Sequence, residues 1–323
     1  MNPVKLSVLM PAYNAEAYIA AAVESILTQT FREFELLVID DGSADGTAGV
    51  VRSFDDRRIR LIRQQNQGIA GALNTGLKAA LSDLIVRFDA DDVCYPERLE
   101  RQYRFMQENP EYILAGSMVD YTDMDGRYVF THHPPATTDG TIRRLSYKVC
   151  PFIHSSVIYR KAPVLRLGGY DPHAHGFEDH LLWRALIRMG KVCNMPEVLL
   201  QVRFNPASVT MDETCRSAAF LSIKYETLER GRISAEEGGQ LLEMIRAQEK
   251  TGIKQGAYHV LMAKKYLWNN SQPRRAREHA RAVLSARCYT RKGYFLLLLS
   301  YVPGIMLRWL YRTFRSPKEY ARI

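Results

Sequence analysis

The sequence predicts an α/β fold in which flanking helices cover a mostly parallel central sheet. Over residues 1 to about 110, apolar runs of strand length alternate with runs of helix formers, which is the pattern of consecutive β-α-β units. Two strand-like runs end in carboxylates, which are Asp40 and Asp41 after one run and Asp89, Asp91 and Asp92 after the other. Ligands bind outside the carboxyl ends of strands in such sheets, so these groups are expected to line one binding edge.

The individual elements of this sheet follow from local residue patterns. Short apolar runs stop at turn-forming residues in four places and predict strands at 5–10, 35–39, 59–62 and 84–88. Helices are predicted after Asn14, which can cap a first turn, after Asp45, and from Gly68 onward. The alternation therefore predicts four strands and three helices up to residue 88.

Beyond residue 112 the pattern becomes mixed and then helical. Short strands, turns and a helix from Glu178 to Met189 are predicted up to about residue 203. Residues 211 to about 287 are expected to be helical throughout, and Pro273 can open the last of these helices. The α/β domain is thus expected to carry a C-terminal helical extension.

The clustered carboxylates point to a charged ligand. Five acidic groups at one edge would repel each other unless a cation or a hydrogen-bonding ligand joined them. Hard oxygen ligands suit magnesium or manganese. The sequence therefore predicts a metal-assisted site for a phosphate-bearing ligand.

Composition limits the classes of protein that fit. A formal net charge of +9 suggests an anionic partner such as a membrane surface, a nucleic acid or a phosphorylated metabolite. The five cysteines are scattered without a C-x-x-C pair, which indicates reduced thiols in a cytosolic protein and no disulfide frame. No charged segment followed by a long apolar run opens the chain, so no secretory signal is expected. The absence of G-x-x-x-x-G-K-[ST] excludes a P-loop enzyme.

The last 33 residues, 291–323, differ from the rest of the chain. The run from Gly293 to Leu307 carries no charge, but it is short for a membrane span and Pro303 interrupts it. Basic residues flank it, namely Arg291, Lys292, Arg308, Arg312, Arg315 and Lys318. Apolar and aromatic surface with basic flanks predicts an anchor lying in the plane of a membrane, and the alternative is a helix docked on the protein's own core. The expected location is cytoplasmic, peripherally associated with the inner face of the cell membrane.

Several motifs resemble those of family 2 glycosyltransferases, which are inverting enzymes with the GT-A nucleotide-sugar-binding fold. The segments that carry this resemblance, in order, are Val8–Asn14, Ser25–Phe31, Val38–Ser43 and Asp89–Asp92. The similarity is dense over residues 5–105, thinner to about 210, and absent from the last 110 residues. We therefore expect a GT-A domain at 1–210, a helical extension at 211–290 and a membrane-associating tail at 291–323.

The resemblance implies roles for the residues that match these motifs. Asp91 is the expected metal ligand with Asp92 as a second, in a site for Mn²⁺ or Mg²⁺, and Asp89 is expected to face the donor ribose. Asp41 is expected to accept a hydrogen bond from the donor base, while Asp40 either binds or only holds its turn. The remaining donor-binding residues are Pro11, Ala12 and Tyr13 as the wall beside the base, together with Gly68 and Asn74.

The acceptor side of the site also has candidates. The Gly176–His180 segment resembles the family's acidic element, which makes Asp179 the expected catalytic base and Glu178 its support; the same pair would also stabilise a helix N-terminus. His154 is a weak acceptor-side candidate, and a structurally satisfied histidine is an equal alternative. Arg203 is the expected cation for the diphosphate, although Asn205 stands where many relatives have His. The processive Q-x-x-R-W motif is absent, which favours transfer of a single sugar.

The predicted activity is that of an inverting, hexosyltransferase-type glycosyltransferase. It would move a sugar from a nucleotide-sugar donor, with uridine as the expected base and thymidine or guanosine open, to a hydroxyl of a lipid-linked saccharide in cell-surface polysaccharide biosynthesis. A sugar-phosphate nucleotidylyltransferase would need a Gly-rich phosphate loop where this chain has Pro11–Asn14. A non-catalytic membrane-associated scaffold with a degenerate transferase fold is the other alternative. The donor sugar, the acceptor and the oligomeric state stay open, and no nucleic-acid partner is expected.

Overall fold

The computed structural model describes residues 4–205, 216–249, 253–285, 289–303 and 306. The chain divides into two compact units. The first comprises Met1–Asp120, His132–Val202 and Tyr225–Ser234, and the second comprises Tyr121–Thr131, Arg203–Lys224 and Ala235–Ile323. The domain boundaries expected at residues 210 and 290 stay predictions.

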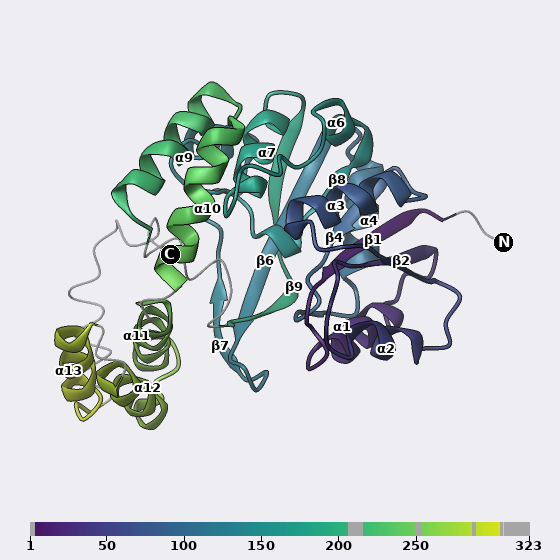
Figure 1. Cartoon of the computed structure of the whole chain (residues 1–323). Coiled ribbons are helices and arrows are strands. Elements are labelled where there is room, and N and C mark those ends of the chain that lie inside the picture. The colour runs from purple at the N-terminus through teal and green to yellow at the C-terminus, as the bar shows by residue number, and fades with distance from the viewer. Residues whose placement is uncertain (1–3, 206–215, 250–252, 286–288, 304–305, 307–323) are drawn as a thin grey trace. The chain divides into compact units, whose positions relative to one another are not determined.

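The helices and strands are labelled in Figure 1. Up to Arg203 they are β1 (Leu6–Ala12), α1 (Ile19–Leu27), β2 (Phe34–Asp40), α2 (Thr47–Arg52), β3 (Ile59–Arg63), α3 (Gly68–Ala79), β4 (Leu84–Arg87), β5 (Val93–Cys94), α4 (Arg98–Glu108), β6 (Tyr112–Thr122), β7 (Tyr128–His132), α5 (Asp139–Leu145), η1 (His154–Ser156), β8 (Ile158–Arg160), α6 (Lys161–Arg166), α7 (Glu178–Leu186) and β9 (Lys191–Arg203). The later helices are α9 (Ala218–Arg230), α10 (Ala235–Glu249), α11 (Ile253–Trp268), α12 (Pro273–Ser285) and α13 (Thr290–Leu299).

The strands of the described residues form one sheet in the order β3-β2-β1-β4-β8-β6-β9-β5, with β7 paired to β6. β1 pairs in parallel with both β2 and β4, and β2 pairs in parallel with β3. At β4 the direction reverses, because β8 pairs with it antiparallel, and β6 in turn pairs antiparallel with β8. The predicted α/β fold class is confirmed, and the four strands predicted in the first hundred residues are β1 to β4.

Helices cover both faces of the parallel part of the sheet. α1 and α2 lie on one face and α3 on the other (Figure 1). This arrangement follows from right-handed crossovers, since the chain moves outward from β1 to β3 and then returns to β4. Gly76 lets α3 pack closely on β1, because a Cβ at this position would come within 2.0 Å of Leu9 Cδ1.

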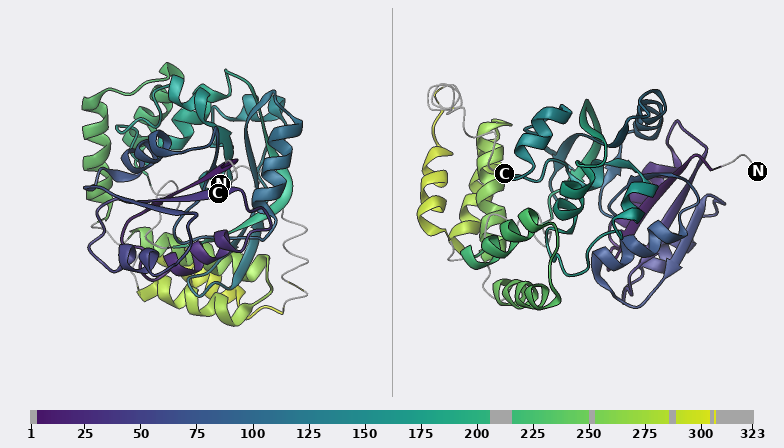
Figure 2. Two further views of the ribbon diagram at one scale, coloured as in Figure 1. Left: turned by 90° about the vertical axis from the view of Figure 1, so that its right-hand side faces the viewer. Right: turned by 90° about the horizontal axis from the view of Figure 1, so that it is seen from above.

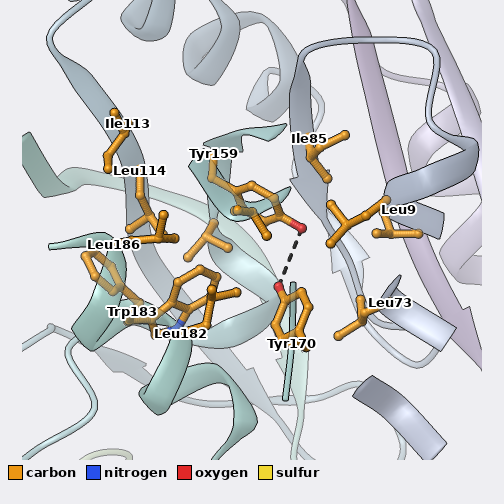
Figure 3. Close-up of a cluster of buried hydrophobic side chains, with 14 of the residues drawn as sticks. Leu9, Leu73, Ile85, Ile113, Leu114, Tyr159, Tyr170, Leu182, Trp183 and Leu186 are labelled. Atoms are coloured by element: carbon orange, nitrogen blue, oxygen red, sulfur yellow. Dashed lines mark hydrogen bonds between the residues drawn. The ribbon is translucent and has the colours of Figure 1, made fainter. Parts of the chain in front are cut away.

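The core of the first unit forms around these parallel strands. Every residue of β2 is buried, as are all but one of β1, which is typical of strands with helices on both faces. Figure 3 shows Leu9 and Ile85 of the strands together with Leu73 of α3 and Trp183 of α7 in one buried cluster. A well-packed core of this kind fixes the strand ends from which the candidate site is built.

The second unit is largely helical. α12 packs against both α11 and α13, which also contact each other, in the yellow-green part of the chain (Figure 2). The Asp123 carboxylate accepts hydrogen bonds from the Tyr266 hydroxyl at 2.8 Å and from Arg275 Nη1 at 3.2 Å. His259 and His279 face each other with their Nδ1 atoms 2.9 Å apart. Within the described ranges, every helix falls short of the length and hydrophobicity that crossing a bilayer would require.

Candidate active site

The predicted carboxylates meet at one edge of the sheet. β1 lies between β2 and β4, and all three run in parallel, so their carboxyl ends share an edge. Ala12 at the end of β1 is in register with Asp40 at the end of β2. Asp89 follows two residues after β4 ends. The residues expected to wall the base, bind its ring and face the ribose therefore emerge side by side.

The turn after β2 is built to hold one carboxylate in place. Asp40 is fully buried; its Oδ1 accepts a hydrogen bond from Ser43 N–H at 3.0 Å and its Oδ2 accepts one from Arg63 Nε at 2.7 Å. Gly42 has φ +80°, and a Cβ there would lie 2.9 Å from the backbone nitrogen of Asn66. Asp40 thus has the turn-holding role that the sequence left open, and Gly42 lets the following loop approach.

Asp41 is the carboxylate that this turn presents. It is buried, and its Oδ1 accepts hydrogen bonds from Gln64 Nε2 at 2.7 Å and from Gln67 N–H at 2.9 Å. Its Oδ2 receives no hydrogen bond from any described residue. The side chain is therefore fixed in orientation by one oxygen, while the other can accept an N–H from a ligand. No motif marks Gln64 in the sequence, because its partner Asp41 lies 23 residues away.

The other donor-side candidates differ in what they contact. Ala12 is buried at the end of β1, whereas the Tyr13 side chain that follows is 55% exposed. Gly68 begins α3 with φ +74°, next to the Gln67 amide that binds Asp41. The side-chain amide of Asn74 donates a hydrogen bond to the Tyr170 carbonyl and accepts one from the Tyr170 N–H, each at 2.8 Å. Its present contacts therefore position another segment of the site.

The aspartates after β4 are organised by a residue that sequence reasoning missed. Arg87, the last residue of β4, is almost completely buried and forms an ion pair with Asp89. Burial alone would lower the pKa of its guanidinium, but the pairing with Asp89, and at longer range Tyr170 and Asp92, raises that pKa above its ordinary value. An arginine in an apolar strand carries no motif, so only its three-dimensional surroundings identify it.

The residues after β4 can be compared with what a divalent cation requires. Asp89, Asp91 and Asp92 offer hard carboxylate oxygens, which suit Mg²⁺ or Mn²⁺. In the part of the chain that the structure describes, no three acidic, His or Cys side chains converge as a complete protein cage. Magnesium is commonly held by one or two carboxylates together with substrate phosphates. The donor set fits a cation of that kind, bound jointly with a diphosphate.

Two carboxylates occupy the first turn of α7. Glu178 is buried and accepts a hydrogen bond from Gly176 N–H at 3.1 Å. Burial, and then the neighbouring Asp179, raise the pKa of Glu178 to about 7. Asp179 accepts hydrogen bonds from the Cys150 thiol, at 3.7 Å, and from the His180 N–H, at 2.6 Å. A helix N-terminus favours the ionised form of a carboxylate, which is the form that a general base needs.

His154 lies in η1, directly before β8, and next to an aromatic cluster. Its Nε2 is 3.2 Å from the Tyr170 hydroxyl, and its ring meets that of Trp183 edge to face. Desolvation, and then the charge of Arg87, hold the pKa of His154 well below its ordinary range, so the ring is neutral. Figure 3 shows that Tyr170 also donates to Tyr159 within the buried cluster. The structurally satisfied alternative for His154 and an acceptor-side role are both compatible with this position.

Arg203 is the predicted site residue that belongs to the second unit. It ends β9, and its Nη1 donates to the Met124 carbonyl at 2.6 Å. The segment that follows Asn205, residues 206–215, lies outside the described residues, as do Arg308, Arg312, Arg315 and Lys318 of the tail. The role of Arg203 toward a diphosphate stays a prediction.

Comparisons with known proteins agree with this architecture. The chain is 32% identical over 203 residues to the amylovoran biosynthesis glycosyltransferase AmsE of Erwinia amylovora, a match over 61% of this chain and 75% of that protein. It is 38% identical over 132 residues, 40% of this chain and 52% of the relative, to the Escherichia coli enzyme named UDP-Glc:alpha-D-GlcNAc-diphosphoundecaprenol beta-1,3-glucosyltransferase WfgD.

Solved glycosyltransferases share the fold. TarS of S. aureus, in complex with UDP-GlcNAc, superposes with a TM-score of 0.54 at 18% identity, over 97% of this chain and 93% of that one. The mannosyltransferase PcManGT of Pyrobaculum calidifontis, in complex with GDP-Man and Mn2+, superposes with a TM-score of 0.56 at 17% identity, over 96% of this chain and 87% of that one. The expected GT-A fold is confirmed. A family model described as glycosyl transferase family 2 matches residues 7–168, and the chain accordingly belongs to that family of glycosyltransferases.

Proposed function

We propose that the protein transfers one sugar, with inversion at the anomeric carbon, from a nucleotide-sugar donor to a hydroxyl of a saccharide acceptor. The observation that carries this proposal is the shared edge where the carboxylates after β2 and β4 emerge on either side of β1. Relatives named for polysaccharide assembly support the reaction class.

The donor base is expected to be uracil. Asp41 offers one carboxylate oxygen while the other is fixed by Gln64 and Gln67, which suits a single ring N–H. Pro11, Ala12 and the exposed Tyr13 would flank the ring. A guanine ring also has an N–H that Asp41 could bind, so the choice of base is part of the experiment below.

The diphosphate would lie over the aspartates that follow β4. Asp89 would face the ribose, and Asp91, with Asp92 as a second ligand, would hold Mn²⁺ or Mg²⁺ together with the phosphates. When bound, such a cation offsets the negative charge that builds on the departing diphosphate. Arg203 is proposed as a further phosphate contact.

Asp179 is proposed as the general base. Its carboxylate would take the proton of the acceptor hydroxyl while that oxygen forms a bond to the anomeric carbon. The bond from that carbon to the diphosphate breaks, and its electron pair leaves with the nucleoside diphosphate. Glu178 would support Asp179 from the same turn of α7, and His154 would lie on the acceptor side.

The acceptor is proposed to be lipid-linked, with the protein held at the inner face of the cell membrane. α13 buries Gly293 and Leu296 and exposes the large side chains of Tyr294, Phe295 and Leu298, and Tyr301, two residues after the helix ends, is also exposed. Arg291 and Lys292 are exposed at the start of the same helix. Aromatic and apolar surface beside basic residues suits the interface of an anionic bilayer.

Donor turnover tests the proposed function directly. Purified protein would be offered UDP-, dTDP- and GDP-sugars with Mn²⁺, Mg²⁺ or chelator, and release of nucleoside diphosphate would be measured. Metal-dependent release from one donor is expected, with a loss of 100-fold or more in Asp91→Ala and in Asp179→Ala, on the order expected for removing a metal ligand or a general base.

A matched control comes from the opposite end of the same strand. Asp83 is exposed and precedes β4, so Asp83→Ala should leave turnover unchanged. If no donor were turned over and calorimetry detected no nucleotide binding, the alternative of a non-catalytic scaffold would replace the proposal.

A further inference from the structure

Arg87 ends β4 two residues before Asp89, one of the carboxylates on which the proposed function depends. Its backbone is held on both sides, because Arg87 N–H donates to the Val157 carbonyl at 3.0 Å and its own carbonyl accepts from Arg98 Nη2 at 2.8 Å. The same Arg98 nitrogen donates to the Ser155 carbonyl at 2.6 Å. The strand end that carries Arg87 is therefore tied to the segment that precedes β8.

The guanidinium of Arg87 contacts one carboxylate, and its charge acts on others at longer range. Toward the donor end it pairs with Asp89, and the charge of Asp92 also acts on it. Toward the acceptor end its positive charge acts on Glu178 of α7, and on His154 and Tyr170. One buried cation thus interacts with carboxylates that lie about 90 residues apart in the sequence.

The buried guanidinium of Arg87 needs acidic partners to offset the cost of its burial. Arg87 is only 2% exposed, and its Nε finds no hydrogen-bond acceptor among the described residues. A buried charge that lacks full hydrogen bonding is costly and is kept only where opposite charges compensate it. The Asp89 side chain is one-third exposed and reaches the edge where a donor would bind. The ion pair therefore restrains an accessible carboxylate from a rigid strand.

We infer that Arg87 is a positioning residue for the transferase reaction: it holds Asp89 in the orientation needed for the donor, and its buried charge also acts on Glu178 of α7. This inference rests on the proposed function for the part that concerns the donor. The groups that face the acidic pair are Arg87 from β4, the Tyr170 hydroxyl, and the Cys150 thiol, which contacts Asp179. Arg87 is the one cation among these three neighbours.

The experiment compares Arg87→Met, which removes the charge, with Arg87→Lys, which keeps a charge without the planar guanidinium. Carbon-13 NMR of protein labelled at glutamate carboxyls would follow the titration of Glu178, identified by the signal lost in Glu178→Gln. In Arg87→Met the midpoint should move to higher pH, and in Arg87→Lys it should stay near that of the unmodified protein. Donor KM should rise roughly 10-fold or more in both variants. Arg87→Met leaves Asp89 without its cation, and Arg87→Lys replaces the planar guanidinium by a single ammonium that cannot hold Asp89 in the same orientation.

Arg160→Met is the matched control. Arg160 ends the neighbouring strand β8 and donates to the Tyr112 and Met106 carbonyls, so its removal perturbs folding without changing the charge beside the carboxylates. Neither the Glu178 midpoint nor donor KM should move in this variant.

The readouts separate the inference from the proposed function. An unchanged Glu178 midpoint in Arg87→Met, or an unchanged donor KM in Arg87→Lys, would overturn the inference even if the enzyme is active. If the unmodified protein turned over no donor, the proposed function would fail while the NMR titration would still decide the electrostatic role. Should Arg87→Met not fold, Arg87→Lys against Arg160→Met still decides the positioning of Asp89.

Discussion

The side-chain amide of Asn74 makes both of its hydrogen bonds to the backbone of a single residue, Tyr170, which lies 96 positions further along the chain. Asn74 Nδ2 donates to the Tyr170 carbonyl, and Asn74 Oδ1 accepts from its N–H, each at 2.8 Å. Tyr170 is buried and contacts His154. This pair therefore links helix α3, beside the donor edge, to the segment that leads into α7.

Replacing Asn74 should destabilise the fold. Asn74→Ala leaves a buried N–H and a buried carbonyl of Tyr170 without partners, for an expected loss of about 2 kcal/mol in the free energy of unfolding. Urea denaturation would measure it. Asn109→Ala is the comparison, because that amide makes one bond, to the Phe105 carbonyl at the end of α4, and should cost less than half as much. Equal losses in the two variants would contradict the linking role.

Glu178 should make stability fall as pH rises. Its pKa is raised to about 7, so between its ordinary value of 4.5 and 7 the folded state holds a proton that the unfolded state has lost. The stability that this proton provides is present below pH 4.5 and is lost through pH 7. Glu178→Gln should therefore raise the free energy of unfolding at pH 8.5 by on the order of 1–3 kcal/mol, which a higher melting temperature would show. At pH 5 the variant should have little effect on stability. A stabilisation equal at both pH values would contradict the assigned cause.

His279 should make stability fall as pH falls, which is the opposite of the effect of Glu178. Burial first, and then the neighbouring His259, lower the pKa of His279 from 6.5 to about 4. Between these values the unfolded state binds more protons, so stability is lost as pH falls from 6.5 toward 4. At pH 5 the loss should be on the order of 1–2 kcal/mol relative to pH 7. His279→Gln should flatten this slope in denaturant titrations, and an unchanged slope would show that other groups produce it.

The exposed face of α13 should bind anionic bilayers. Substituting Tyr294, Phe295 and Leu298 together by Ser removes the apolar side chains that the helix exposes and should weaken vesicle binding roughly 10-fold or more. Sedimentation with phosphatidylglycerol vesicles would measure this, and high salt should weaken binding further. Leu81→Ser, a change at an exposed leucine of the first unit, should have no effect. Undiminished binding of the triple variant would place the membrane contact elsewhere.

The parallel half of the sheet could be predicted from sequence because its signals are local. The apolar residues of β1 and β2 are continuous, as strands buried on both faces require, and the aspartates follow immediately after the strands end. Residues 178–186 begin with two carboxylates, which is how a helix start is recognised. In each case the residues that determine the structure are neighbours in the chain.

Strand β8 and the contacts of Arg87 and Asn74 could not be predicted from sequence, because each depends on residues that are distant in the chain. β8 has three residues and no readable periodicity, so neither its existence nor its antiparallel pairing with β4 could be inferred from sequence. Arg87 stands in an otherwise apolar strand, yet its burial is compensated by Asp89 and, at longer range, by Asp92. Asn74 was assigned to the donor site from its motif, while its hydrogen bonds go to Tyr170. Such relationships appear only when the chain is folded.

The reversal of strand direction at β4 has an evolutionary consequence. Because β8 begins beside the end of β4, with Ile158 opposite Val86, the segment before β8 opens onto the same edge as the loops after β1, β2 and β4. Two stretches of sequence, one before residue 110 and one after 150, thus face a common space without sharing loops. Mutation can change side chains of the later stretch while the earlier one keeps hydrogen bonds such as those of Asn74 to Tyr170 and of Arg98 to Ser155, because these use backbone atoms of the later stretch. Under the proposed function, a lineage with this topology can diversify the molecule it modifies while retaining the molecule it consumes.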